Sequence, residues 1–148
     1  MKNEIQITEM SLFDLENIKN ILISDFDDFW NYNILKEELE SSNSKYIIAK
    51  TNDGEIIGFA GIKIILDKAD IMNIVVKKSW RKQGVGNSLL SNLISLCKNS
   101  NLSSLSLEVN EDNLPAIHLY EKFGFKQIGV RKNYYHSKDG IIMEYLIN

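Results

Sequence analysis

The sequence predicts an α+β fold in which about four helices flank one mixed, mostly antiparallel sheet. Short alternating segments between residues 45 and 76 are separated by tight turns, which is typical of an antiparallel meander. Apolar residues then recur at helical spacing over residues 85–97, and another alternating segment covers residues 104–109. Because this strand–helix–strand step lies inside an otherwise antiparallel pattern, we expect a mixed sheet.

The first half of the chain predicts two helices and four strands. A helical pattern begins at Ser11, a capping residue, and runs to about Ser24, and a shorter helix covers residues 32–41. Asp53 and Gly54 favour a hairpin turn, because this pair tolerates positive φ angles. The expected strands lie at residues 4–8, 45–51, 55–66 and 69–76. The side chains expected to face inward on the helices are Leu12, Leu15, Ile18 or Lys19, Leu22, Leu35 and Leu39.

The second half predicts two more helices and closes with strands at residues 125–131 and 141–147. One helix begins after Gly84, and the other is capped by Asn113 and ends at Gly124. The buried stripes expected on these helices are Val85, Leu89, Leu90, Leu93, Ile94 and Cys97, then Ala116, Leu119, Tyr120 and Phe123.

Composition indicates one soluble globular domain over residues 1–148. Hydrophobic residues make up 44% and charged residues 25% of the chain, and the single proline belongs to no linker. The longest apolar run, residues 56–62, is far shorter than the roughly 20 residues that cross a bilayer. One cysteine, Cys97, excludes internal disulfides, and no apolar signal region follows Met1, so we expect a cytoplasmic protein without membrane contact. One cysteine and two histidines are too few for a structural zinc site, and we expect no metal.

Charge is distributed unevenly along the chain. Residues 1–55 carry 12 acidic and 5 basic side chains, net −7, whereas residues 56–148 carry 8 acidic and 12 basic ones, net +4. Neither half has the basic tail or basic face that nucleic acids need, so we expect no nucleic-acid partner. The acidic part is either an ordinary solvated surface or a rim that attracts a basic partner.

A glycine-containing loop between a strand and a helix is the first candidate site. Its sequence, R-K-Q-G-V-G at residues 81–86, follows a run of cations. A helix start exposes N–H groups and a partial positive charge, and glycines let the backbone approach an anion closely. We therefore predict a phosphate-binding loop, although two glycines can also form only a turn. The loop lacks the ending of a Walker loop and the third glycine of the dinucleotide fingerprint. The cations are Lys77, Lys78, Arg81 and Lys82.

The same loop carries a family resemblance. R-x-x-G-x-G after a hydrophobic strand resembles the acetyl-CoA loop of the GNAT superfamily of N-acetyltransferases, and the E-V…N…A…LYE..GF segment at residues 108–125 resembles it further. The R-x-N-Y-Y element at residues 131–135 resembles the RimI-type subgroup, which acetylates the N-terminal alanine of a small-subunit ribosomal protein. The resemblance implies a GNAT-like fold and acetyl-CoA as cosubstrate. The residues that it implies at acetyl-CoA are Ile74, Val75, Val76, Arg81, Lys82, Gln83, Gly84, Val85, Gly86, Asn87 and Asn113, the last of which can instead only cap its helix.

Acetyl transfer to an amine needs a base and an acid. The attacking amine must be neutral, and an α-amine, with a pKa of about 7.7–8.0 against about 10.4 for lysine, loses its proton about 3.5 kcal/mol more easily. Glu108 lies on the strand face opposite the apolar residues and is the candidate base, directly or through water; the alternative is an exposed strand residue. The resemblance implies Tyr120 as the acid for the departing thiolate, although it also fits plain core packing. A bulge or splay at residues 74–76 would free N–H groups for the thioester oxygen.

Aromatic side chains are the candidates for the acceptor site. Trp30, Tyr134 and Tyr135 can line a peptide groove or simply pack as core and strand-end aromatics. The chain departs from the RimI-type pattern in three places: Phe29 precedes Trp30 where Pro is usual, Asn110 replaces an Arg, and no Pro follows Tyr135.

The expected function is direct acetyl transfer to a primary amine, with a protein N-terminus, possibly that of a ribosomal protein, as the first candidate acceptor. A small amine such as a polyamine, an amino acid or an antibiotic is the alternative, and a non-catalytic acyl-CoA-binding module is the second alternative.

Overall fold

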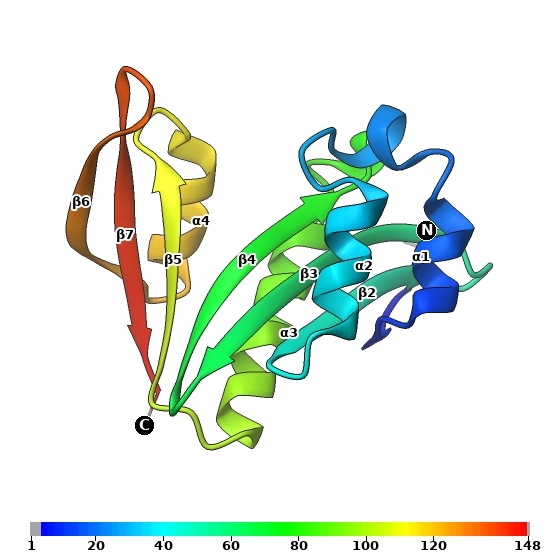
Figure 1. The fold of residues 1–148 in the computed structure, drawn as a ribbon, viewed down its shortest axis with the longest axis horizontal. Coiled ribbons are helices and arrows are strands. Elements are labelled where there is room, and N and C mark those ends of the chain that lie inside the picture. Colours follow the sequence, from blue (N-terminus) through cyan, green and yellow to red (C-terminus); the bar gives the residue numbers. More distant parts are fainter. Residues whose placement is uncertain (1–3, 148) are drawn as a thin grey trace. The chain divides into compact units, whose positions relative to one another are not determined.

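The computed structural model describes residues 4–147, so residues 1–3, where we expect no signal region, and residue 148 lie outside it. Its elements follow the predicted order, with two short helical turns, η1 and η2, added (Figure 1). They are β1 (Ile5–Glu9), α1 (Leu12–Ile18), the π-helical η1 (Leu22–Phe26), α2 (Tyr32–Glu40), β2 (Ser44–Thr51), β3 (Ile56–Ile65), β4 (Lys68–Val76), the 3-10 turn η2 (Lys78–Trp80), α3 (Val85–Asn99), β5 (Ser104–Asn110), α4 (Leu114–Lys122), β6 (Lys126–Tyr135) and β7 (Lys138–Leu146).

The strands form one seven-stranded sheet in the order β1-β2-β3-β4-β5-β7-β6. Pairs β1–β2, β2–β3, β5–β7 and β6–β7 are antiparallel, whereas β4 and β5, which α3 connects, are parallel. The predicted mixed, mostly antiparallel sheet is therefore confirmed.

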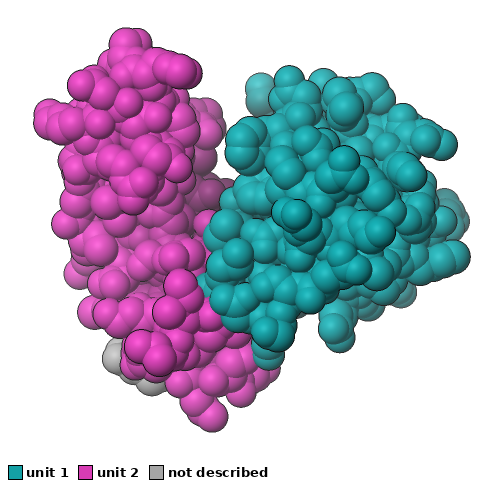
Figure 2. Space-filling view, viewed as in Figure 1, with its two compact units in different colours: residues 1–63, 72–93 teal, residues 64–71, 94–148 magenta. Residues whose placement is uncertain are grey.

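The chain divides into two compact units (Figure 2). The first contains residues 1–63 and 72–93, and the second contains residues 64–71 and 94–148. The single domain expected from composition stays a prediction. Within residues 4–147, no helix is both long and apolar enough to cross a membrane.

In the first unit, helices cover both faces of the strands, with α1 and α2 on one face and α3 on the other (Figure 1). Residues 56–62 of β3 are therefore all buried, as their unbroken apolar run requires. Two glycines of β3 let neighbours approach closely: a Cβ at Gly58 would lie 3.1 Å from Leu89, and one at Gly61 would lie 2.2 Å from the ring of Tyr46. The core on the α1 and α2 face comprises Met10, Leu15, Ile18, Leu22, Phe26, Leu35, Tyr46, Ile48, Ile56, Phe59 and Val75.

In the second unit, α4 lies beside β5 (Figure 1), and a chain of aromatic rings connects it to β7. Ring centroids of Tyr120 and Phe125 are 5.7 Å apart, and those of Phe125 and Tyr145 are 5.5 Å apart. Tyr145 lies opposite Leu105 in the β5–β7 ladder, so both belong to the face that α4 covers. Side chains of a strand alternate between faces, which places Glu108 on the other face of β5.

Three predicted elements end at different residues from those expected. The first helix does not run to Ser24: α1 stops at Ile18, and the π-helical η1 follows after residues 19–21 and buries Leu22 and Phe26. Leu12 was expected inside but is 41% exposed, because it begins α1 and has no preceding turn to cover it. β6 extends to Tyr135 through a bulge, and β7 begins at Lys138, so the closing hairpin is longer than predicted.

Candidate functional site

The predicted phosphate-binding loop joins η2 to α3 in the first unit. Gly84 has a φ angle of +87° and ends the loop with its carbonyl accepting from the Ser88 N–H at 3.1 Å, so α3 begins immediately after it. The first N–H groups of α3, from Val85 onward, have no partner within the helix by its geometry. A Cβ at Gly84 would meet nothing within 4 Å, and one at Gly86 would meet only Val76, at 3.9 Å. An anion can therefore approach this backbone closely.

Two of the four cations near the loop are engaged with the protein itself. Lys77 forms an ion pair with Glu55, with Nζ and Oε2 2.9 Å apart. Arg81 donates through Nε to the Val76 carbonyl at 3.2 Å and through Nη2 to the Phe26 carbonyl at 3.1 Å. Arg81 thus ties the loop to the end of β4 and to η1, and its remaining N–H groups are what it can offer a phosphate.

The β4 residues predicted at acetyl-CoA lie beyond the part of this strand that pairs with β5. The β4–β5 ladder consists of Lys68 with Ser104, Ala69 with Leu105, and Asp70 with Ser106. β4 itself continues to Val76. The backbone groups of Ile74, Val75 and Val76 are thus outside that ladder, and their contact with a thioester stays a prediction.

Glu108 is the most unusual carboxylate of the second unit. It lies opposite Ile142 in the β5–β7 ladder, and its side chain is 21% exposed. Oε1 is 3.4 Å from Nη2 of Arg131 on β6. Oε2 is buried and has no hydrogen-bond partner among the described residues. A buried acceptor without a donor is rare in proteins and suggests that a bound group supplies the donor.

Gly140 on β7 makes room for this carboxylate, and sequence analysis missed it. A Cβ at Gly140 would lie 2.9 Å from Oε2 and 3.2 Å from Cδ of Glu108. In the ladders, Gly140 lies opposite Asn110 on one side and opposite Arg131 on the other. The missing side chain therefore lets Glu108 reach across β7 to Arg131. Only the strand register reveals this role, and that register cannot be read from the sequence.

Tyr120 and Glu108 approach β5 from different faces. The Tyr120 ring is half-buried on α4 and packs against Phe125. Burial, and secondly the neighbouring Tyr135, raises the pKa of Tyr120 to about 12. The phenol therefore holds its proton at neutral pH, which suits a proton donor.

Tyr134 and Tyr135 form an edge-to-face pair with ring centroids 4.9 Å apart. Tyr134 is 51% exposed, and the guanidinium carbon of Arg131 lies 4.7 Å from its ring centroid. Burial raises the pKa of Tyr135, followed by the charge of Glu108 and by Tyr134, whereas Arg131 lowers it. The second unit thus brings both tyrosines to the same charged pair.

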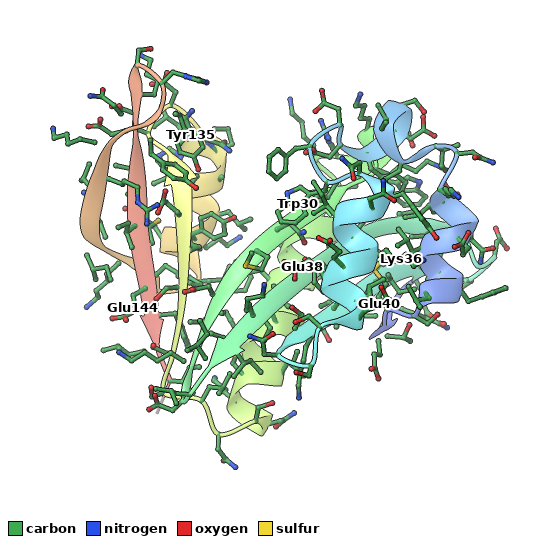
Figure 3. The ribbon with its side chains drawn as sticks, in the orientation of Figure 1. Trp30, Lys36, Glu38, Glu40, Tyr135 and Glu144 are labelled. Atoms are coloured by element: carbon green, nitrogen blue, oxygen red, sulfur yellow. The ribbon has the colours of Figure 1, made fainter. Side chains whose placement is uncertain are left out.

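Two further candidates have structural roles of their own. Asn113 caps α4, since its Oδ1 accepts from the Ala116 N–H at 3.3 Å, and a contact with acetyl-CoA stays a prediction. Trp30 lies in the first unit just before α2, half-buried against its core and edge-on to Phe29 at 5.2 Å, whereas Tyr135 belongs to the second unit (Figure 3). The candidate aromatic residues of the acceptor site therefore belong to different units. Within residues 4–147, no group of three or more His, Cys, Asp or Glu residues could hold a metal ion.

Comparisons with known proteins support the resemblance to N-acetyltransferases. The acetyltransferase (GNAT) family model matches residues 15–125. A Bacillus subtilis (strain 168) protein with the name "Putative ribosomal protein bS18-alanine N-acetyltransferase" is 36% identical over 150 residues, which cover 100% of this chain and 99% of that protein. The ribosomal protein bS18-alanine N-acetyltransferase of Haemophilus influenzae (strain ATCC 51907 / DSM 11121 / KW20 / Rd) is 37% identical over 112 residues, 75% of this chain and 74% of that protein. Among solved structures, the ribosomal-protein-S18-alanine N-acetyltransferase from Escherichia coli matches with a TM-score of 0.87 and 29% identity, covering 98% of this chain and 95% of that chain.

Proposed function

Because this chain belongs to the acetyltransferase (GNAT) family, we propose that it transfers the acetyl group of acetyl-CoA to the N-terminal α-amine of a protein in the cytoplasm. The acceptor that we propose is a ribosomal protein with N-terminal alanine, of the bS18 type after which the relatives are named.

The reaction that we propose is a direct attack. The neutral amine forms a C–N bond to the thioester carbonyl carbon, the C–S bond breaks, and the amine loses a proton to Glu108, directly or through water. Tyr120 gives its phenolic proton to the departing thiolate, and its pKa of about 12 means that the proton is present at neutral pH. Residues 74–76 and the start of α3 would bind the acetyl-CoA amides and phosphates.

One observation supports this mechanism above the others: the buried Oε2 of Glu108, which has no hydrogen-bond partner among the described residues. Leaving a buried acceptor unpaired costs about 1–3 kcal/mol. An N–H of the acceptor amine, or a water that relays its proton, would satisfy this oxygen. A carboxylate is a modest base, and such a base suits an α-amine better than a lysine side chain.

The two faces of β5 support direct transfer rather than an acyl-enzyme route. Glu108 projects from one face, whereas Tyr120 packs through Phe125 on the other. A base on the amine's side and an acid on the sulfur's side are what a single displacement requires. Cys97 is fully buried in the second unit and is a poor candidate for an acetyl-cysteine intermediate.

The proposal is tested with a panel of acceptors and acetyl-CoA. The panel contains Ala-led peptides, the same peptides with a blocked N-terminus and an internal lysine, and spermidine. We expect mass spectrometry to place the acetyl group on the α-amine of Ala-led peptides. Faster turnover of spermidine would contradict the acceptor class, and release of CoA with none of these amines would contradict transferase activity toward them.

A further inference from the structure

We propose that Arg131 balances the charge of Glu108, so that the site binds the acceptor amine without stabilising its protonated, unreactive form. Arg131 is in this sense a positioning residue with an electrostatic task. The inference rests on the proposed function, because it concerns the amine that Glu108 would serve.

The strand register places the two side chains together. Arg131 lies opposite Gly140, and Gly140 lies opposite Asn110, two residues after Glu108 on the same face of β5. Any larger residue at position 140 would separate them, since even a Cβ there would lie 2.9 Å from the Glu108 carboxylate. The register of the three neighbouring strands β5, β7 and β6 thus fixes the 3.4 Å contact between Arg131 and Glu108.

Arg131 is held in place although its side chain is 57% exposed. Its guanidinium lies 4.7 Å from the Tyr134 ring centroid, and Tyr134 is itself fixed edge-on against Tyr135. A flat guanidinium can stack on a ring and pair with a carboxylate at once, which the ammonium of lysine does poorly. The chain has 17 basic residues and only two of them are arginines, Arg81 and Arg131. An arginine at this position therefore departs from the chain's default cation.

The other charges near Glu108 are largely paired among themselves. Lys132 pairs with Asp139 at 3.5 Å, and Lys138 pairs with Asp112 at 3.3 Å. The side chain of Glu111 accepts the Asp139 N–H. On the face of Glu108, the ladders also place the cations Lys68, Lys126 and Lys138, but among the described residues Arg131 is the cation that forms an ion pair with Glu108. The charged and titratable groups on this face of β4, β6 and β7 are Lys68, Asp70, Lys126, Arg131, Tyr135, Lys138 and Glu144.

A lone carboxylate would bind an ammonium group well but would also hold its proton. Opposite charges close together favour the charged form, so Glu108 alone would raise the pKa of the bound amine. The amine would then bind more tightly and react more slowly at neutral pH. The cation of Arg131 opposes this effect, because it repels the ammonium form and leaves the neutral amine unaffected. If Arg131 and Glu108 formed only an ordinary exposed ion pair, its loss would change neither the affinity for the amine nor the rate at which the amine reacts.

Arg131→Gln should therefore change kcat and KM in a characteristic way that depends on pH. At pH 7 we expect kcat and KM for an Ala-led peptide to fall together, each by about tenfold for a shift of about one pKa unit in the bound amine. Because the profile of kcat reports groups of the bound complex, its acidic limb should move to higher pH. Near pH 9.5, kcat should return to within about twofold of the parent value. Lys132→Gln, which removes the neighbouring cation, is the matched control and should leave the profile unchanged.

Two outcomes would overturn the inference. One is an unchanged kcat and KM in Arg131→Gln at pH 7. The other is a loss of kcat/KM of equal size at every pH, which would mean that Arg131 only orients Glu108. If the parent enzyme acetylates no α-amine, the proposed function fails, and a titration that needs no turnover still tests Arg131. NMR of the Tyr135 ring should find its pKa raised in Arg131→Gln and lowered in Glu108→Gln, and an unmoved Tyr135 in Arg131→Gln would refute the electrostatic role.

Discussion

Replacing Gly140 with alanine tests how finely the Glu108 carboxylate must be placed. The new Cβ would lie 2.9 Å from Oε2, whereas ordinary contacts begin at 3.4 Å, so the carboxylate must move by about half an ångström. A misplacement of about 1 Å at a catalytic group can cost about 10²-fold in rate. For a displacement about half as large, we expect kcat/KM for an Ala-led peptide to fall roughly tenfold.

The fold should tolerate this change better than the reaction does. The clashing atoms belong to the far end of the Glu108 side chain. The loss of folding stability should therefore be at the low end of what overpacking costs, about 1 kcal/mol. That corresponds to a loss of about 3 °C in Tm. Gly129→Ala on β6 is the matched control, because its Cβ would lie 3.6 Å from Ile142, an ordinary contact. Steady-state kinetics and thermal unfolding of both variants check the prediction. Full activity of Gly140→Ala beside an active Gly129→Ala would refute the idea that this glycine makes room for the base.

Substitutions at Glu108, Tyr120 and Gly86 test the proposed base, the proposed acid and the phosphate-binding loop. Glu108→Gln should lower kcat/KM by roughly 10²–10⁴, while Glu144→Gln on the same sheet face should not, and near-parental rates in Glu108→Gln would exclude it as the base. Tyr120→Phe should slow turnover with acetyl-CoA binding retained in calorimetry; the parent should have no alkaline limb from this phenol before about pH 12, given its pKa of about 12. Acetyl-CoA at a hundredfold excess over Kd should stabilise the parent by about 2.7 kcal/mol, and Gly86→Glu should abolish that thermal shift; a parent without any shift would contradict the loop assignment.

Most of the fold could be predicted because its elements are separated by clear sequence signals. The change from alternating to helical periodicity at Gly84 marks α3, and Asn113 with Gly124 marks the two ends of α4. The π turn of η1 could not be predicted, because the spacing of Leu15, Ile18 and Leu22 is also that of one continuous helix. The early start of β7 could not be predicted either, since the turn at His136 has a φ angle of +60° without a glycine.

The candidate site, like the fold, could be predicted from the sequence only in part. The loop glycines and Glu108 follow from local pattern, since a strand position and a strand–helix turn are local properties. The environment of Glu108 depends on which residues of three strands lie side by side, and sequence periodicity carries no register. From the sequence alone, Gly140 is therefore interpreted as a turn residue. Its position between Asn110 and Arg131 becomes clear only when β5, β7 and β6 are aligned. Arg81 is a similar case, because its bond to the Phe26 carbonyl joins residues 55 apart in the sequence.

The acidic first part of the chain leads to a last prediction, about how a basic acceptor reaches the site. Residues 1–55 have a net charge of −7, but several acids are already neutralised: Asp14 pairs with Lys50 and Glu38 with Lys63. Asp27 is used within its own turn, where it accepts the N–H groups of Phe29 and Trp30. Asp28 is exposed two residues before Trp30, a candidate acceptor-site residue, and we therefore choose it to test attraction of a basic peptide tail.

Asp28→Asn should therefore weaken association with a basic peptide without changing the chemical step. Two unit charges about 10 Å apart in water interact by about 0.4 kcal/mol, so we expect kcat/KM for an Ala-led peptide with a basic tail to fall about twofold at low salt. The loss should disappear at high salt, because exposed charges are screened over about 8–10 Å near physiological ionic strength. A peptide with a neutral tail should show no loss at any salt concentration. Asp53→Asn, in the exposed turn before β3, removes the same charge elsewhere in the first unit and is the control. Equal rates for basic and neutral tails with the parent enzyme at low salt would refute steering, and equal losses in Asp28→Asn and Asp53→Asn would mean that net charge, not this segment, attracts the acceptor.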